Sequence, residues 1–85
     1  MQQYDLKVKP NAQKKLDKLP KADYHRVLAA FSILSHNPFI GKKLKGEYAG
    51  SYSYRVWPYR IIYDIYKKEL LVLVVRVGHR QRVYR

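Results

Sequence analysis

The chain contains no cysteine, and this absence removes several kinds of chemistry at once. Without thiols there can be no disulfide framework, no thiolate nucleophile and no cysteine-based zinc site. Three histidines are present, but His25, His36 and His79 are too widely scattered to give the spacing of metal ligands. We therefore expect neither a bound metal nor a cofactor.

Acidic residues are also scarce. The 85 residues include 18 Lys and Arg against 6 Asp and Glu, which gives a formal net charge of +12 and a pI near 10.1. This balance is typical of proteins that bind nucleic acids. A basic protein that is merely soluble, or one neutralised by an acidic partner, would have the same composition. The charge is spread from Lys7 to Arg85 rather than gathered in an amphipathic helix or polybasic tail, which argues against a membrane partner.

Long apolar runs are missing as well. The longest, residues 70–75, is far shorter than the roughly 20 residues of a membrane helix, and the N-terminus lacks the apolar stretch of a signal peptide. The sequence also offers no carboxylate pair, no Ser-His-Asp set and no glycine-rich phosphate loop. We expect a cytoplasmic protein with one domain, residues 1–85, and a small compact core.

Hydrophobic periodicity predicts a strand followed by two helices. Residues 3–8 alternate apolar and polar side chains, as in a half-buried strand. Asn11 is placed to cap a short helix that ends before Pro20. A longer apolar stripe predicts a second helix over residues 21–36, ended by Pro38. The two helices are expected to form a hairpin.

The second half of the chain predicts three strands. Residues 41–50, rich in glycine and lysine, are expected to form an exposed loop. Residues 51–57 and 59–66 alternate as strands on either side of a proline turn, and residues 70–77 are apolar enough for a central strand. The fold class is therefore α+β, in the order β-α-α-β-β-β, with the helical hairpin on one face of a small, mainly antiparallel sheet. The other face remains free for function.

Strand alternation also predicts a cluster of guanidinium groups on that free face. It places Ser53, Arg55 and Trp57 on one side of their strand, and the following strands can bring Arg60 and Arg80 to the same side. Gathered arginines repel one another unless an anion lies between them, and phosphate matches their bidentate geometry. Arg55, taken alone, is equally consistent with a solvated strand residue.

Proton transfer beside such a cluster would need a phenol or an imidazole. Tyr84 is the first candidate, because guanidinium groups favour a phenolate, and His79 is its rival. RNA carries its own nucleophile, the 2′-hydroxyl, so cleaving it without a metal requires only a base, an acid and positive charge. The aromatic residues that could stack on bases are Tyr48, Tyr52 and Trp57.

Four segments carry a resemblance to a known family. They are Lys43-Leu44-Lys45-Gly46, Tyr52-Ser53-Tyr54-Arg55, Tyr59-Arg60-Ile61-Ile62-Tyr63, and Val77-Gly78-His79-Arg80 with the following Val83-Tyr84. Together they look like the RelE/ParE toxin superfamily, and the match spans nearly the whole chain. The resemblance implies a RelE-like fold and the role of toxin in a type II toxin–antitoxin system.

The superfamily contains both RelE-like mRNA endonucleases and ParE-like poisons of DNA gyrase. The RelE pattern has a basic residue at the position of Arg55, arginines at Arg60 and Arg80, and a tyrosine at Tyr84, all of which this chain has. ParE-like members generally lack the complete set. The resemblance therefore favours RNA cleavage.

The chain departs from the RelE pattern at Ser53, where a lysine often helps to activate the 2′-hydroxyl. A serine cannot supply that charge, which leaves His79, Lys43 and Lys45 as candidate substitutes for the base. The residues expected to contact RNA outside the chemistry itself are Lys43, Lys45, Ser53, Trp57 and Arg82.

The resemblance implies an endoribonuclease that cuts mRNA in the ribosomal A site and leaves a cyclic phosphate. It also implies a cognate antitoxin that covers the basic surface, and operator DNA would be bound only through the toxin–antitoxin complex. A gyrase inhibitor and a non-catalytic nucleic-acid-binding module remain alternatives, since either could use the same surface without moving a proton.

Overall fold

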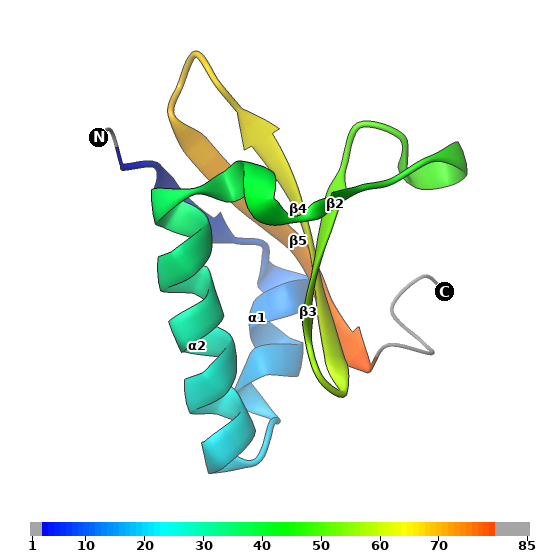
Figure 1. The fold of residues 1–85 in the computed structure, drawn as a ribbon. Coiled ribbons are helices and arrows are strands. Elements are labelled where there is room, and N and C mark those ends of the chain that lie inside the picture. Colours follow the sequence, from blue (N-terminus) through cyan, green and yellow to red (C-terminus); the bar gives the residue numbers. More distant parts are fainter. Residues whose placement is uncertain (1–2, 80–85) are drawn as a thin grey trace.

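The computed structural model of the protein describes residues 3–79, and within that range two helices lie against one face of a five-stranded sheet (Figure 1). The elements are β1 (Asp5–Val8), α1 (Pro10–Asp17), α2 (Lys21–His36), β2 (Lys42–Lys43), β3 (Tyr52–Val56), β4 (Tyr59–Tyr66) and β5 (Leu71–His79). Short 3-10 turns, η1 (Pro38–Ile40) and η2 (Gly46–Tyr48), flank β2. The predicted α+β class is confirmed.

The sheet has the order β1-β5-β4-β3-β2, with β1 parallel to β5 and all other pairs antiparallel. The mainly antiparallel sheet and the interior position of β5 agree with the sequence. The prediction of residues 41–50 as loop alone is wrong, because β2 lies there and pairs Lys42 with Ser53 and Lys43 with Tyr52. Two exposed residues are too few to show the alternation of a strand.

Two predicted boundaries also differ. α1 begins at Pro10 with Lys9 as the N-cap, so Asn11 lies inside the first turn instead of capping it. Proline suits the first helical position, because its φ is already helical and its missing N–H would have no partner there. β5 starts at Leu71, later than the predicted range 70–77, since Leu70 adopts a left-handed turn conformation with a φ of 51°. It also extends beyond that range, to His79.

The core lies between the helices and the sheet. Each fully buried aliphatic side chain contributes about 1.5–3 kcal/mol relative to exposure, which fixes both helices on this face. The buried cluster includes Leu16 on α1, Val27 and Leu34 on α2, Ile61 and Tyr63 on β4, and Val72, Val74 and Val77 on β5. No helix within residues 3–79 is long and apolar enough to cross a membrane.

Tyr63 joins the sheet to η1. Its ring is fully buried, and its hydroxyl donates a hydrogen bond to the carbonyl oxygen of Pro38 at 2.6 Å. Burial raises the pKa of Tyr63 to about 12. We expect Tyr63→Phe to lower the free energy of unfolding by about 1–3 kcal/mol, because the Pro38 carbonyl would stay buried without its donor. Urea unfolding at neutral pH measures this loss.

The same substitution should change the dependence of stability on pH. The phenol of Tyr63 ionises near pH 10 in the unfolded chain and near pH 12 in the folded one. Its contribution is therefore complete below pH 10 and is lost as the pH rises toward 12. Between these values the parent should lose stability more steeply than Tyr63→Phe. Equal slopes for the two proteins would contradict the assignment.

Candidate functional site

The face of the sheet away from the helices carries neighbouring arginines. β3 and β4 pair Arg55 directly with Arg60, and β4 and β5 pair Ile62 with Arg76. Residues paired across antiparallel strands project from the same face, with Cβ atoms about 4.5–5.5 Å apart. Arg55 and Arg60 are thus side by side, as the alternation predicts. We call Arg55, Arg60 and Arg76 the arginine row.

Arg76 belongs to this row, although strict alternation from the start of β5 predicts the opposite face for it. Counting by two from Val72 and Val74 would place position 76 among the residues that face the helices. A bulge in β5 inserts Val75, so Val77 takes the next core position and Arg76 turns to the open face. The available signal was the charge itself, because an arginine rarely points into an apolar core.

The residues of the arginine row differ in burial. Arg60 is partly buried, with its Nε atom covered, whereas Arg55 and Arg76 are exposed. Ser53 lies beside Ile62 in the register and is only 6% exposed. A phosphate that meets the partly buried Arg60 would be partly shielded from solvent, and electrostatic attraction there is stronger than in bulk water.

The short strand β2 decides which lysine joins this face. Lys43 pairs with Tyr52, which packs against the core, so Lys43 has the register of the helix-covered side. Lys42 pairs with Ser53 and so has the register of the arginine row. Lys45 precedes η2 and is exposed. Sequence reasoning missed Lys42 because the pairing of β2 was not predicted.

The prediction that Trp57 continues the strand face that carries Ser53 and Arg55 is wrong, because Trp57 lies beyond the end of the strand. β3 ends at Val56, and the cis peptide between Trp57 and Pro58 lies in the turn to β4. Trp57, 53% exposed, lines a hollow of about 330 Å³ together with Ile33 of α2 and Arg55. Arg26 of α2 donates a hydrogen bond to the carbonyl oxygen of Trp57 at 2.7 Å. Alternation fails here because the strand stops before the tryptophan.

A polar brace holds this turn against α2. The hydroxyl of Tyr59 donates to Oδ2 of Asp23 at 2.8 Å, and Arg26 lies 3.4 Å from the other carboxylate oxygen. The hydrogen bond to Asp23 is the main cause of the raised pKa of Tyr59. The brace fixes the ends of β3 and β4, next to Arg55 and Arg60.

His79 ends β5 on the side of the sheet opposite the arginine row. It pairs with Tyr59, whose ring it meets edge to face at 6.4 Å, while Gly78 is the residue opposite Arg60. Because Tyr59 reaches toward α2, His79 shares the helix-covered side. The structure therefore does not bring His79 to Arg60. Three further candidates lie outside the described residues: Arg80, Arg82 and Tyr84.

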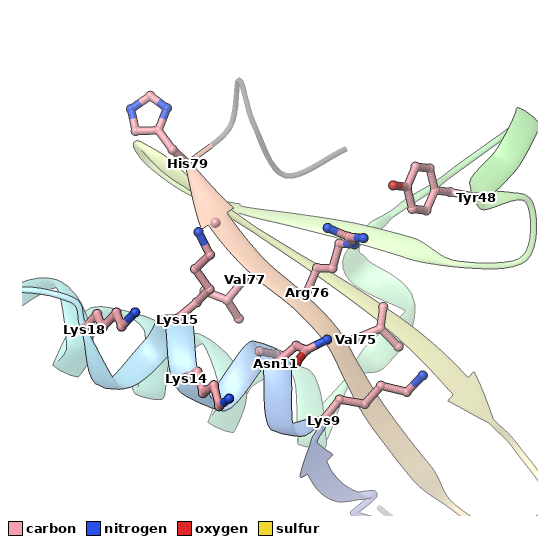
Figure 2. Close-up of a pocket in the computed structure, with 12 residues that line it drawn as sticks. Lys9, Asn11, Lys14, Lys15, Lys18, Tyr48, Val75, Arg76, Val77 and His79 are labelled. Atoms are coloured by element: carbon pink, nitrogen blue, oxygen red, sulfur yellow. The ribbon is translucent and has the colours of Figure 1, made fainter. Parts of the chain in front are cut away.

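A second basic region lies between α1 and the C-terminal half of β5 (Figure 2). We call this hollow of about 770 Å³ the α1–β5 groove. In Figure 2, Lys15 extends from α1 toward the strand and Tyr48 lies beyond Arg76. None of its lining residues among the described positions is acidic. Its polar lining residues include Lys9, Asn11, Lys14, Lys15, Lys18, Arg76 and His79.

Comparison with known proteins agrees with this architecture. The family model for the ParE toxin of the type II toxin–antitoxin system parDE matches residues 6–84. The chain belongs to the RelE/ParE toxin superfamily. Toxin RelG of Mycobacterium tuberculosis is 38% identical to it over 88 residues, covering 96% of this chain and 97% of that protein.

Two solved structures support the same membership of the RelE/ParE superfamily. A chain of the toxin–antitoxin complex RelBE2 from Mycobacterium tuberculosis superposes with a TM-score of 0.84 at 36% identity, covering 92% of this chain and 99% of that one. A chain of the archaeal RelE–RelB complex from Pyrococcus horikoshii gives a TM-score of 0.82 at 30% identity, with 96% and 100% covered. The RelE-like fold expected from the sequence is confirmed.

Proposed function

We propose that this type II toxin is a ribosome-dependent endoribonuclease that cuts mRNA in the A site and so inhibits translation in the cytoplasm. The observation that carries the proposal is the direct pairing of Arg55 with Arg60, joined by Arg76, on the open face of the sheet. Like charges placed directly opposite one another destabilise a sheet. A bound phosphate reverses that cost, since its oxygens accept paired hydrogen bonds from guanidinium groups.

The proposed reaction uses the RNA's own nucleophile. The 2′-oxygen attacks the adjacent phosphorus while the bond to the 5′-oxygen breaks, which leaves a 2′,3′-cyclic phosphate and a 5′-hydroxyl. A base accepts the 2′-hydroxyl proton, and an acid protonates the leaving oxygen. Arg55 and Arg60, together with Arg80, stabilise the negative charge that builds up on the phosphoryl oxygens. Tyr84 is proposed to take part in proton transfer.

Ser53 leaves this site without the lysine of the RelE pattern, and we assign the missing charge to Lys42. Lys42 and Ser53 are paired across β2 and β3, so the side chain of Lys42 begins at the position next to Ser53 on the arginine face. Lys42 extends the positive charge toward the edge of the sheet. It thereby joins Lys45 as a candidate for the base.

Inhibition of DNA gyrase is the competing function, because the matching family model describes ParE toxins. Adding the purified protein in parallel to a translating extract and to a gyrase supercoiling assay separates the two. Our proposal expects mRNA cut in the extract and normal supercoiling by gyrase. Intact mRNA with blocked supercoiling would establish the alternative, and RNA binding without either effect would indicate a non-catalytic module.

We further propose that a cognate antitoxin covers the arginine row and that the complex binds operator DNA. Two observations support this partner: the net charge of +12 and the similarity to chains from toxin–antitoxin complexes. A domain with this charge would otherwise bind cellular RNA without selection.

The antitoxin should therefore carry an acidic segment and compete with RNA. We expect that saturating amounts of it, expressed from the neighbouring gene, stop mRNA cleavage and prevent the toxin from binding RNA. Cleavage by the free toxin and by the purified complex can be compared on the same programmed ribosomes. The occlusion model fails if the complex still binds ribosomes and cuts mRNA at the rate of the free toxin.

A further inference from the structure

The α1–β5 groove is continuous with the arginine row through one side chain. Arg76 lines the groove, and its register beside Ile62 places it on the open face of the sheet. In Figure 2 its guanidinium lies on the opposite wall from α1, on the side of Tyr48. A strand of RNA with one phosphate at Arg55 and Arg60 therefore has a basic path toward α1.

Two lysines of α1, Lys14 and Lys15, and its C-cap residue Lys18 form the other wall of the groove. Lys14 and Lys18 are separated by four positions and Lys15 and Lys18 by three, so their side chains lie along one side of the helix. Ala12 and Leu16, only 1% and 2% exposed, fix the rotation of α1 against the core. The lysines are therefore presented to the groove by a rigid element.

The charges of these lysines are not balanced within the described part of the fold. The ion pair found there joins Arg26 to Asp23, on α2 and away from the groove. Asp17 is the acidic residue of α1, but it accepts a hydrogen bond from Nε2 of Gln13 at 2.9 Å and does not line the groove. Such a concentration of one sign of charge in a hollow attracts a polyanion.

The floor of the groove is the exposed edge of β5. β1 pairs with β5 only from Leu71 to Val74, so within the described chain residues 75–79 have no strand partner on the side of α1. Backbone N–H groups at such an edge can donate to phosphate oxygens and sugar hydroxyls, as they do in many nucleic-acid interfaces. The groove thus offers both charge and hydrogen-bond donors.

We propose that the α1–β5 groove is a second RNA-binding site, which holds the sugar–phosphate backbone away from the scissile phosphate. The inference rests on the proposed function for the placement of the cleaved phosphate at the arginine row. An acidic peptide would be attracted to the same lysines. RNA is favoured because the groove connects with the arginine row through Arg76 and contains few apolar side chains, namely Ala12, Val75 and Val77, with which a peptide could pack.

The test compares two double variants with the same change in charge. Lys15→Gln with Lys18→Gln removes two groove lysines, and Lys21→Gln with Lys68→Gln removes two exposed lysines that do not line the groove. Binding of a fluorescein-labelled single-stranded RNA is measured by anisotropy over a series of salt concentrations. The groove variant should bind roughly tenfold more weakly at physiological salt. The plot of log K against log salt has a negative slope, and the magnitude of that slope should decrease by about 1.4 in the groove variant. The control should keep the slope and affinity of the parent.

Equal losses in both double variants would overturn the proposal, because the effect would then follow net charge alone. It would also be overturned if the groove variant bound RNA like the parent but bound the antitoxin more weakly, which would identify an acidic peptide as the occupant. The assay does not depend on cleavage. A protein without nuclease activity could therefore still show the predicted loss of RNA binding in the groove variant. If the parent cleaves mRNA but the groove variant binds RNA like the parent, only the proposal for the groove is rejected.

Discussion

Arg60→Ala should lower the single-turnover rate of mRNA cleavage on the ribosome by about 10²- to 10³-fold. Loss of one preorganised donor to the transition-state charge costs about 2.7–4 kcal/mol. Arg60 is the partly buried residue of the arginine row and is paired directly with Arg55, so its guanidinium is the best placed to meet the phosphate. Rates are measured with toxin in excess over programmed ribosomes.

Two further variants separate this role from a structural one. Arg60→Lys keeps the charge but loses the planar fork, and we expect a rate between those of Arg60→Ala and the parent. Lys68→Ala, at the far end of the sheet, should cleave like the parent. Urea unfolding of each variant shows whether the fold persists. An Arg60→Ala protein that is folded and cuts mRNA at the parental rate would refute the catalytic assignment.

Tyr84→Phe should slow cleavage by roughly 10²-fold or more while leaving ribosome binding nearly unchanged. The substitution keeps the aromatic ring and deletes only the hydroxyl, so it removes proton transfer and little else. Single-turnover cleavage and co-sedimentation with ribosomes measure the two quantities on the same preparation.

His79→Ala is the companion to this variant. Because His79 pairs with Tyr59 on the helix-covered side of the sheet, its replacement should reduce the cleavage rate less than Tyr84→Phe does. The opposite ranking, with a large loss for His79→Ala and none for Tyr84→Phe, would exchange the roles of the two residues.

The parts of the site that alternation placed correctly lie on one hairpin. Arg55 and Arg60 are close in sequence, and a tight turn fixes the register between their strands, so counting by two was sufficient. The apolar sequence of β5 likewise predicted its interior position, between β1 and β4. These local and compositional signals determine most of the fold.

The rest depends on irregularities that have no compositional signature. The bulge at Val75 lies at the end of the apolar run of residues 70–75, where an extra residue changes the direction of Arg76 without changing the pattern. The same shift of phase makes Gly78, rather than Val77, the residue opposite Arg60 and turns His79 to the helix-covered side. Trp57 was misplaced because alternation says nothing about where a strand ends.

The pairing of β2 was missed for a different reason. Two lysines at the edge of a sheet have neither the alternation nor the β-branched side chains typical of strands. Only the tertiary pairing shows that Lys42, and not Lys43, lies in register with Ser53 on the arginine face. The sequence alone named Lys43 and gave no sign that Lys42 shares the face of Ser53.

The most direct test of the account is to map the RNA ends that the parent protein produces. Purified ribosomes are loaded with a defined mRNA and an initiator tRNA, and the toxin is added with and without the ribosomes. We predict a cut within the A-site codon only when ribosomes are present, with a 2′,3′-cyclic phosphate on one fragment and a 5′-hydroxyl on the other. Uncut mRNA on ribosomes, at toxin concentrations that block supercoiling by gyrase, would contradict the account.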